Sequence, residues 1–262
     1  MAEMNKYALI TGASSGIGFE LAKLFARDRY NLVIVGRKLP ELEKCASELR
    51  GMAVEVVPVA ADLFEKDAPR NIYNQVTSRG LQIDALVNDA GQGEYGLFTD
   101  TDLDRETDLI QLNIVAYVAL TKHFLKDMLA RGRGKILNVG SIAGEVPGAY
   151  HSVYHGTKAF INSWTEALRS EVKDKGITVT LLLPGATDTD FFNKAGMQES
   201  KILDTGLSAP EEVARDGFDA LMKGDDKIIS GLKNKAMVGM SQVIPDETAT
   251  EMMKKQQEPR NK

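Results

Sequence analysis

Tyr154 and Lys158 are the two residues whose types and spacing point most directly to chemistry. Residues four apart share one face of a helix, with Cβ atoms about 5–6 Å apart. Tyrosine has a pKa near 10 in water, and we expect the Lys158 ammonium to lower it because a cation favours the phenolate. Ser141, at the end of an apolar run, could hold a substrate oxygen beside them. Tyrosine and lysine one turn apart are also common on solvated helix faces, so the pair depends on its context.

Three glycines, Gly12, Gly16 and Gly18, follow the first apolar run in the sequence TGASSGIG, and an amphipathic helical pattern comes after them. Glycine permits a tight turn and a close approach of a ligand to the backbone. The N–H groups at a helix N-terminus attract phosphate. A glycine-rich turn without a ligand is the alternative, but the strand before and the helix after favour a site for the pyrophosphate of a dinucleotide.

The end of the second predicted strand indicates which dinucleotide. An acidic residue there usually holds a free ribose 2′-hydroxyl, whereas a 2′-phosphate is matched by arginine. This chain has Arg37 and Lys38 at that place and no carboxylate before Glu41. A guanidinium can donate two parallel hydrogen bonds to a phosphate. We therefore expect NADP(H) rather than NAD(H), the alternative being an ordinary surface arginine.

Apolar, β-branched runs alternate with helical patterns along the chain. The predicted strands occupy residues 7–11, 32–35, 54–59, 83–87, 135–139 and 177–183, with a short edge strand at 227–230. The longest helical region covers about 102–131, and a capping box at 208–211 starts another helix. This alternation predicts an α/β protein with a Rossmann-type, doubly wound parallel sheet of about seven strands and helices on both faces.

No Pro/Gly/Ser-rich linker and no repeat interrupts the pattern, so we predict a single domain over residues 1–241. Two long irregular stretches remain, and long loops in compact domains are usually functional or disordered. The loop at about 184–207 contains Phe191, Phe192 and Met197, and we expect it to cover a substrate. The polar C-terminal tail, residues 242–262, is expected to fray.

Composition excludes several classes of protein. Of the 262 residues, 43% are hydrophobic and 26% are charged, as in ordinary soluble globular proteins. A net charge of −5 without a basic run in the folded region argues against nucleic-acid binding. The single cysteine, Cys45, excludes an intramolecular disulfide and a multi-cysteine zinc site. No stretch approaches the ~20 apolar residues of a membrane span, and no signal peptide is recognised, so we expect a cytoplasmic protein.

Taken together, the motifs resemble those of the classical short-chain dehydrogenase/reductase family, over roughly residues 6–230. Arg37 and the PGATDTDFF stretch are most similar to its branch of general NADP-dependent reductases. The motifs that carry the resemblance are TGASSGIG at 11–18, Asp62-Leu63, NDAG at 88–91, Asn113, Ser141, Tyr154-x-x-x-Lys158, Pro184-Gly185, Thr187 and Thr189.

The resemblance implies an enzyme that transfers a hydride between a nicotinamide and a carbonyl or alcohol, with no metal. Tyr154 would donate a proton to the carbonyl oxygen, or remove it in the reverse direction. Lys158 would lower the tyrosine pKa and hold the nicotinamide ribose. Ser141 would hydrogen-bond the substrate oxygen where negative charge develops, and Asn113 would keep a water that links Lys158 to solvent.

The resemblance also implies the cofactor contacts. Asp62 would accept a hydrogen bond from the adenine amino group, residues 88, 90 and 91 would pass the adenosine ribose, and Thr187 and Thr189 would orient the nicotinamide carboxamide. The full set is Gly12, Ser14, Ser15, Gly16, Ile17, Gly18, Arg37, Asp62, Leu63, Asn88, Ala90, Gly91, Tyr154, Lys158, Pro184, Gly185, Thr187 and Thr189. In the family, the helices that carry Asn113 and Tyr154 pair subunits, which implies a homodimer or homotetramer.

Asp89 departs from the family pattern, which has Asn-Asn-Ala-Gly at 88–91. An amide both donates and accepts, whereas an ionised carboxylate only accepts, so we expect an effect on stability more than on chemistry. His151 and His155 flank Tyr154, and we expect them at the surface or in the pocket wall. Two other function classes stay open: a catalytically silent NADP(H)-binding redox sensor, and an epimerase or dehydratase.

Overall fold

Seven parallel strands form one sheet in the order β3-β2-β1-β4-β5-β6-β7. The structure is a computed structural model and describes residues 6–241 and 243–260. The strands are β1 (Tyr7–Thr11), β2 (Asn31–Gly36), β3 (Val56–Ala60), β4 (Ile83–Asn88), β5 (Gly134–Val139), β6 (Ile177–Leu183) and β7 (Lys227–Ile229). The predicted doubly wound sheet of about seven strands is confirmed, with β7 at an edge as expected.

The central strands are buried on both faces because helices cover the sheet from either side. Leu9 and Ile10 of β1 and the run Leu32–Val35 of β2 are fully buried. Continuous apolar, β-branched runs are what a parallel sheet between two helical layers requires. One face packs against α1 (Gly16–Arg27), α2 (Leu39–Arg50) and α8 (Pro210–Lys223). The other packs against α3 (Ala68–Ser78), α5 (Ala116–Arg131) and α6 (Ser152–Val172).

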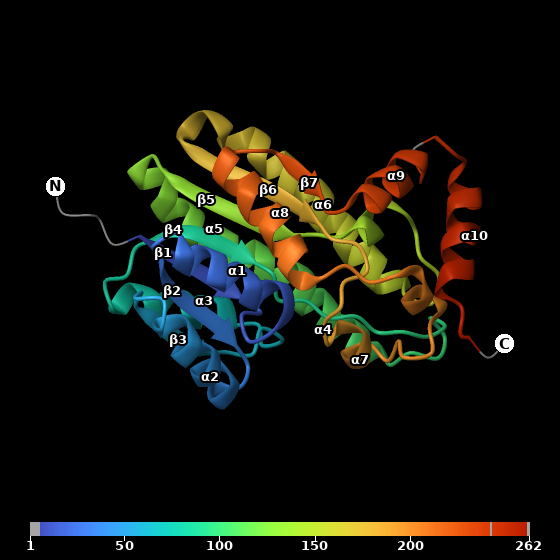
Figure 1. Cartoon of the computed structure of the whole chain (residues 1–262), viewed down its shortest axis with the longest axis horizontal. Helices are drawn as coiled ribbons and strands as arrows, with labels where there is room; N and C mark the ends of the chain where they lie inside the picture. Colours follow the sequence, from blue (N-terminus) through green and yellow to red (C-terminus); the bar gives the residue numbers. More distant parts are fainter. Residues whose placement is uncertain (1–5, 242, 261–262) are drawn as a thin grey trace.

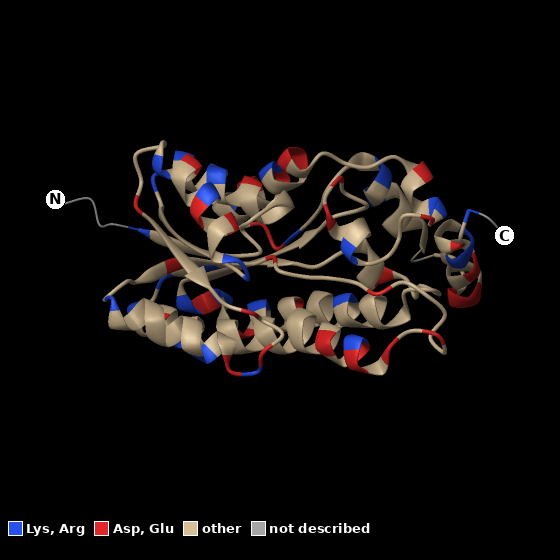
Figure 2. Ribbon diagram, turned by 90° about the horizontal axis from the view of Figure 1, so that it is seen from below, with Lys and Arg blue, Asp and Glu red and all other residues tan. Residues whose placement is uncertain are grey.

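Lys and Arg residues are interspersed with Asp and Glu residues along the helices of both layers (Figure 2). In the described part of the chain, no helix is both long enough and apolar enough to cross a membrane.

The order of the strands reverses direction between β1 and β4. After β1 the chain adds β2 and β3 on one side of it, and then crosses to β4 on the other side. In open α/β sheets, ligands bind in the crevice beyond the carboxyl ends of the strands at such a reversal. The glycine stretch after β1 and residues 88–91 after β4 lie at this place.

The long helical region predicted at about 102–131 is interrupted. It consists of α4 (Leu103–Ile110), a π-helical turn (Gln111–Val115) and α5. Single π-helical turns inside α-helices are frequently found at functional sites. The turn carries Asn113, so the interruption coincides with a predicted catalytic residue.

The predicted capping box at 208–211 does not form. Helix α8 begins at Pro210 after Ala209, without a side-chain cap. Ser208 instead makes a backbone bridge with Thr187, and its N–H donates to the carbonyl of Ala186. The helix is present because Pro210 suits a first helical turn, but the serine is used to close the loop after β6.

Within the polar tail that was expected to fray, residues 246–257 form a helix. Residues 232–241 form α9 (Leu232–Ser241), and α10 (Asp246–Gln257) follows it. In Figure 1 both helices lie at the end of the molecule that also carries α7 (Phe191–Lys194). Ala249 and Met253 of α10 are buried in a small cluster with Val146. The loop at 184–207 likewise contains α7 and a 3₁₀ turn (Lys201–Thr205).

Candidate active site

One cavity of about 390 Å³ lies at the carboxyl ends of the strands. It runs from the glycine stretch after β1 and the end of β2, past β4, β5 and the start of α6, to α7 and α10. Most of the predicted site residues line it: Gly12, Ser14, Ser15, Gly16, Ile17, Arg37, Asp62, Leu63, Ala90, Gly91, Ser141, Tyr154, Lys158, Pro184, Gly185, Thr187 and Thr189. Gly18, Asn88 and Asn113 are not among the residues that line it.

The glycine stretch has the shape that a dinucleotide phosphate needs. Gly12 and Gly16 have φ of 71° and 57°, a region that favours glycine. A Cβ on Gly12 would lie 2.8 Å from the Asp89 carboxylate, and one on Gly16 would lie 3.0 Å from Thr189 Cγ2. Helix α1 starts at Gly16 with no side-chain cap and no acidic residue in its first turn. Its first N–H groups are therefore available to a diphosphate, except that of Gly18, which donates to the Asp89 carboxylate.

The end of the cavity beyond β2 carries the predicted 2′-phosphate residue. Arg37 is exposed, and its guanidinium carbon lies 5.6 Å from the centre of the Phe64 ring. The guanidinium of Arg105, from α4, lies 5.2 Å from the same ring. Asp62 accepts a hydrogen bond from the Phe64 N–H at 3.1 Å. Phe64 lines the cavity but belongs to none of the sequence motifs, so it was not predicted as a site residue.

Tyr154 lies at the other end of the cavity, on the first turn of α6. Its phenol makes a hydrogen bond with the Ser141 hydroxyl. The imidazole of His151 stacks on the Tyr154 ring at 4.4 Å between centroids and 13° between planes. Ser141 follows β5, and its hydroxyl also accepts from the Ala143 N–H at 3.0 Å. The chain thus brings a hydroxyl and a phenol together, as the motif predicted.

The expected lowering of the Tyr154 pKa is wrong for this structure. Burial raises the pKa of the Tyr154 phenol to about 12, the Ser141 hydrogen bond lowers it, and the Asp89 carboxylate raises it. Lys158 Nζ lies 5.9 Å from the centre of the Tyr154 ring and donates to the Val139 carbonyl at 2.9 Å. Burial also lowers the pKa of Lys158 to about 8, although Asp89 raises it. Desolvation by burial is therefore the largest influence on the pKa of the Tyr154 phenol.

Asn113 is fully buried behind Gly91. Its Oδ1 accepts from the Gln92 N–H at 3.1 Å, and its Nδ2 donates to the Gln92 carbonyl at 2.9 Å and to Thr157 Oγ1 at 3.1 Å. The amide therefore fastens the π-helical turn to the segment after β4 and to α6. Its predicted part in a water relay stays a prediction.

Asn88 and Asp89 have different surroundings although they are neighbours. The Asn88 side chain is fully buried and donates to Thr121 Oγ1 at 3.0 Å and to Asn138 Oδ1 at 2.9 Å, so it points away from the cavity. Asp89 lines the cavity and accepts a hydrogen bond from the Gly18 N–H. Burial raises the pKa of the Asp89 carboxyl to about 7, whereas Lys158 and the Gly18 N–H lower it.

The part of the cavity near α7, α9 and α10 is mostly apolar, and much of it comes from the C-terminal half of the chain. Phe191, Phe192 and Met197 line it as predicted from the loop sequence. The 3₁₀ turn, α9 and α10 contribute residues that the sequence did not predict. The additional lining residues on this side are Ile202, Met237, Met253, Gln256 and Gln257. Apolar walls with a few polar groups are typical of small-molecule sites.

His155, on α6, connects this helix to α10. Its Nδ1 donates to the Val146 carbonyl at 2.6 Å, which leaves Nε2 free to accept from Gln257 Nε2 at 2.8 Å. The Gln257 carbonyl accepts from Tyr95 and, at 3.2 Å, from the Ser200 hydroxyl. His151 and His155 are both buried and line the cavity, so they are in the pocket wall and not at the surface.

Residues 6–200 match the family model described as short chain dehydrogenase. A very-long-chain 3-oxoacyl-CoA reductase of Mycosarcoma maydis is 34% identical over 180 residues, which are 67% of this chain and 51% of that protein. This chain therefore matches about half the length of that relative.

Two further similarities cover more of the chain. Ketoacyl reductase HetN of Nostoc sp. is 28% identical over 230 residues, 88% of this chain and 76% of that one. A solved short-chain dehydrogenase of Sphingobium yanoikuyae in complex with NADPH has 29% identity and a TM-score of 0.81. That similarity covers 92% of this chain and 96% of the other.

Proposed function

The chain belongs to the short-chain dehydrogenase family, and on that premise we propose that it is an NADP(H)-dependent reductase of a carbonyl substrate. The observation that carries this proposal is the placement of Tyr154, Ser141 and Lys158 in one cavity with the glycine stretch of α1. A dinucleotide held by its diphosphate at α1 would extend toward Tyr154. The solved relative in complex with NADPH supports the choice of cofactor.

Bound NADP(H) would supply or accept the hydride. Gly12, Gly16 and the N-terminal N–H groups of α1 would hold its diphosphate, Arg37 its 2′-phosphate, and Thr187 and Thr189 its carboxamide. Glycine is needed at both positions, because a Cβ on Gly12 or Gly16 would collide with Asp89 or Thr189.

Side chains of the protein would supply the proton and stabilise the developing charge. The Ser141 hydroxyl would donate to the substrate carbonyl oxygen, where negative charge develops during reduction. Tyr154 would give its phenolic proton to that oxygen. Lys158, whose pKa of about 8 leaves it mostly protonated at neutral pH, would hold the nicotinamide ribose. Asn113 would fix the segment at Gly91 beneath it.

The raised pKa of Tyr154 favours one direction of the reaction. A phenol with a pKa of about 12 is protonated at neutral pH, which is the form that reduction needs. Oxidation of an alcohol needs the phenolate, which is scarce at that pH. We therefore infer that carbonyl reduction is the direction in which the site works best at neutral pH.

The substrate is an apolar carbonyl compound in this proposal. Phe191, Phe192, Met197 and Met253 supply an apolar wall beside Tyr154. The printed names of two relatives, a 3-oxoacyl-CoA reductase and a ketoacyl reductase, make 3-oxoacyl thioesters the first compounds to test.

A panel of aldehydes, ketones and 3-oxoacyl thioesters, with NADPH oxidation followed at 340 nm, tests the proposal. Turnover of at least one compound that depends on Tyr154 supports a reductase. Tight NADPH binding with no turnover across the panel would favour the redox sensor instead. The presence of Ser141, Asn113, Tyr154 and Lys158 favours the enzyme, because a sensor has no need for all four.

We also propose that the chain forms a homo-oligomer through α4, α5 and α6. Ile110, Val115 and Phe160 are apolar and 40–43% exposed, and they lie on the helices that carry Asn113 and Tyr154. Light scattering of the purified protein would give its mass in solution. Substitution of Phe160 by glutamate should lower that mass to the monomer value.

A further inference from the structure

We propose that Lys194 is a cofactor-binding residue, which exchanges its ion pair with Asp190 for the diphosphate of NADP(H). Lys194 ends the short helix α7 and lines the same cavity as the glycine stretch. This inference rests on the proposed function, because it needs a dinucleotide in that cavity.

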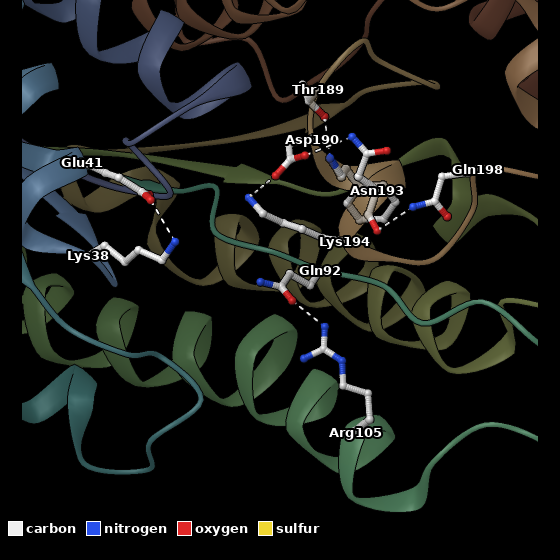
Figure 3. Close-up of polar contacts among 10 residues, drawn as sticks. Lys38, Glu41, Gln92, Arg105, Thr189, Asp190, Asn193, Lys194 and Gln198 are labelled. Carbon is white, nitrogen blue, oxygen red and sulfur yellow. Dashed lines mark hydrogen bonds and ion pairs between the residues drawn. The ribbon is translucent and has the colours of Figure 1, made fainter.

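The segment before α7 lies directly on the glycine stretch. A Cβ on Gly16 would be 3.0 Å from Thr189 Cγ2, so Thr189 packs against the first residue of α1. Asp190 is the next residue, and Lys194 follows one helical turn later. Its Nζ lies 3.0 Å from Asp190 Oδ2. Figure 3 shows the Lys194 ammonium pointing toward the Asp190 carboxylate and away from Gln198.

Lys194 is the cavity-lining cation that lies nearest the expected position of the diphosphate. Among the described residues, the Lys and Arg side chains that line the cavity are Arg37, Lys38, Lys158 and Lys194. Arg37 and Lys38 lie after β2, and Lys38 is paired with Glu41 at 2.9 Å (Figure 3). Lys158 is buried beside Tyr154 at the opposite end. Lys194 is the remaining cation, next to the loop where the diphosphate would lie.

The ion pair between Lys194 and Asp190 can be broken at little cost. Their side chains are 41% and 51% exposed, and ion pairs this exposed contribute little to stability because water solvates both charges. A diphosphate carries two negative charges and offers stronger, charge-assisted hydrogen bonds. The exchange would also draw α7, and with it Phe191, toward the bound cofactor.

The negative charge of Asp190 should weaken the binding of the cofactor. Its pKa is lowered, first by the hydrogen bond from Lys194, so it is ionised at neutral pH. A carboxylate beside the diphosphate repels it, and it also competes for Lys194. Removing the Asp190 charge should therefore free Lys194 and strengthen the binding of the cofactor.

The experiment measures dissociation constants of NADPH, NADH and adenosine 2′-monophosphate by titration of the whole protein. For Lys194→Gln we expect NADPH and NADH to bind about 3–10-fold more weakly, a change that corresponds to the loss of about one charged contact. The losses should be equal for the two, because both carry the diphosphate. Adenosine 2′-monophosphate lacks the diphosphate, and its binding should not change.

Lys201→Gln is the matched control. Lys201 is paired with Glu258 at 3.0 Å, its side chain is 39% exposed, and it does not line the cavity. It removes the same charge from the same flank of the molecule, so all three dissociation constants should stay within twofold of the wild type. Asp190→Asn should bind NADPH at least as tightly as the wild type.

Three outcomes would overturn the inference. One is an unchanged affinity of Lys194→Gln for both dinucleotides. Another is a loss for NADPH that NADH does not share, which would assign Lys194 to the 2′-phosphate. The third is an Asp190→Asn variant that loses as much affinity as Lys194→Gln, which would mean that the pair only holds α7 in place. A wild-type protein that binds no dinucleotide would instead contradict the proposed function.

Discussion

The carboxylate of Asp89 accepts a hydrogen bond from the backbone N–H of Gly18, inside the first turns of the helix that follows the glycine stretch. A Cβ on Gly18 would lie only 2.5 Å from Asp89 Oδ2, so the two residues are in close contact. The carboxyl group is held in a desolvated place, which raises its pKa to about 7. The chain therefore carries an ionisable group where its family has an amide.

Asp89→Asn should stabilise the protein at neutral pH. The folded-state pKa of Asp89 lies above its ordinary value of 3.8. The stability contributed by its protonated form is therefore complete below about pH 4 and is lost as the pH rises through 7. Asparagine keeps an acceptor for the Gly18 N–H and has no charge to desolvate. We expect a gain in the free energy of unfolding on the order of 2–4 kcal/mol at pH 8, and almost none at pH 4.

Urea unfolding of both proteins between pH 4 and 8 measures this. The difference between variant and wild type is the relevant quantity, because burial lowers the pKa of His151 and His155 and makes both proteins less stable in acid. A difference that does not change with pH would show that Asp89 is ionised throughout the range.

The pH dependence of turnover should differ between the two directions. Oxidation of the alcohol needs the Tyr154 phenolate, and its pKa of about 12 makes the phenolate scarce near neutrality. We expect oxidation to rise about three- to tenfold per pH unit from pH 7 to 9. Reduction should change little between pH 6 and 7, because the Tyr154 phenol and the Lys158 ammonium, with pKa values of about 12 and about 8, are both protonated there. Initial rates at saturating cofactor test both, and a plateau of oxidation below pH 8 would contradict the raised pKa.

Arg37→Ala should weaken the binding of NADPH by about 10–100-fold and that of NADH by less than about threefold, because a paired guanidinium–phosphate contact is lost with NADPH alone. Fluorescence titration with each cofactor measures the effect. Lys44→Ala is a useful control, since Lys44 is exposed on the neighbouring helix α2 and does not line the cavity. Equal losses for the two cofactors would show that Arg37 does not bind the 2′-phosphate.

Gln257→Leu should loosen α10 without affecting the cofactor. It removes the hydrogen bond to His155 and keeps the backbone carbonyl that accepts from Ser200. We expect faster amide hydrogen exchange in α10 and a KM for the carbonyl substrate that rises about 3–10-fold, with the NADPH dissociation constant unchanged. Gln256→Leu makes the same change one residue earlier and should leave the exchange of α10 as it is. Unchanged exchange in Gln257→Leu would mean that the apolar contacts of Met253 and the hydrogen bonds to the Gln257 carbonyl suffice to hold the helix.

The strands of the sheet and the glycine stretch could be predicted from the sequence, because each depends on residues that are neighbours in the chain. The run Leu32–Val35 is apolar and β-branched, so it predicts a buried strand wherever the sheet places it. The π-helical turn at Asn113 could not be predicted in this way. Its extra residue is accommodated by hydrogen bonds to Gln92 and Thr157, which are distant in the sequence.

The helix in the tail and the raised pKa of Tyr154 could not be predicted from the sequence, because both depend on how distant residues pack. Ala249, Met253 and Gln257 are spaced four apart and share the buried face of α10, but charged residues surround them and hide the pattern. The helix is held by His155, which lies 102 residues earlier. The sequence places a lysine one turn after Tyr154, but it does not show that the phenol is buried and that burial raises its pKa.

Tyr154→Phe tests the central claim most directly, because it removes the phenolic oxygen and keeps the ring that stacks on His151. The measurement is the rate of NADPH oxidation with the best substrate of the panel, together with the NADPH dissociation constant. We expect the rate to fall about 10²–10⁴-fold while the dissociation constant stays within about twofold of the wild type. A variant that keeps its rate within about tenfold of the wild type would contradict the assignment of Tyr154 as the proton donor.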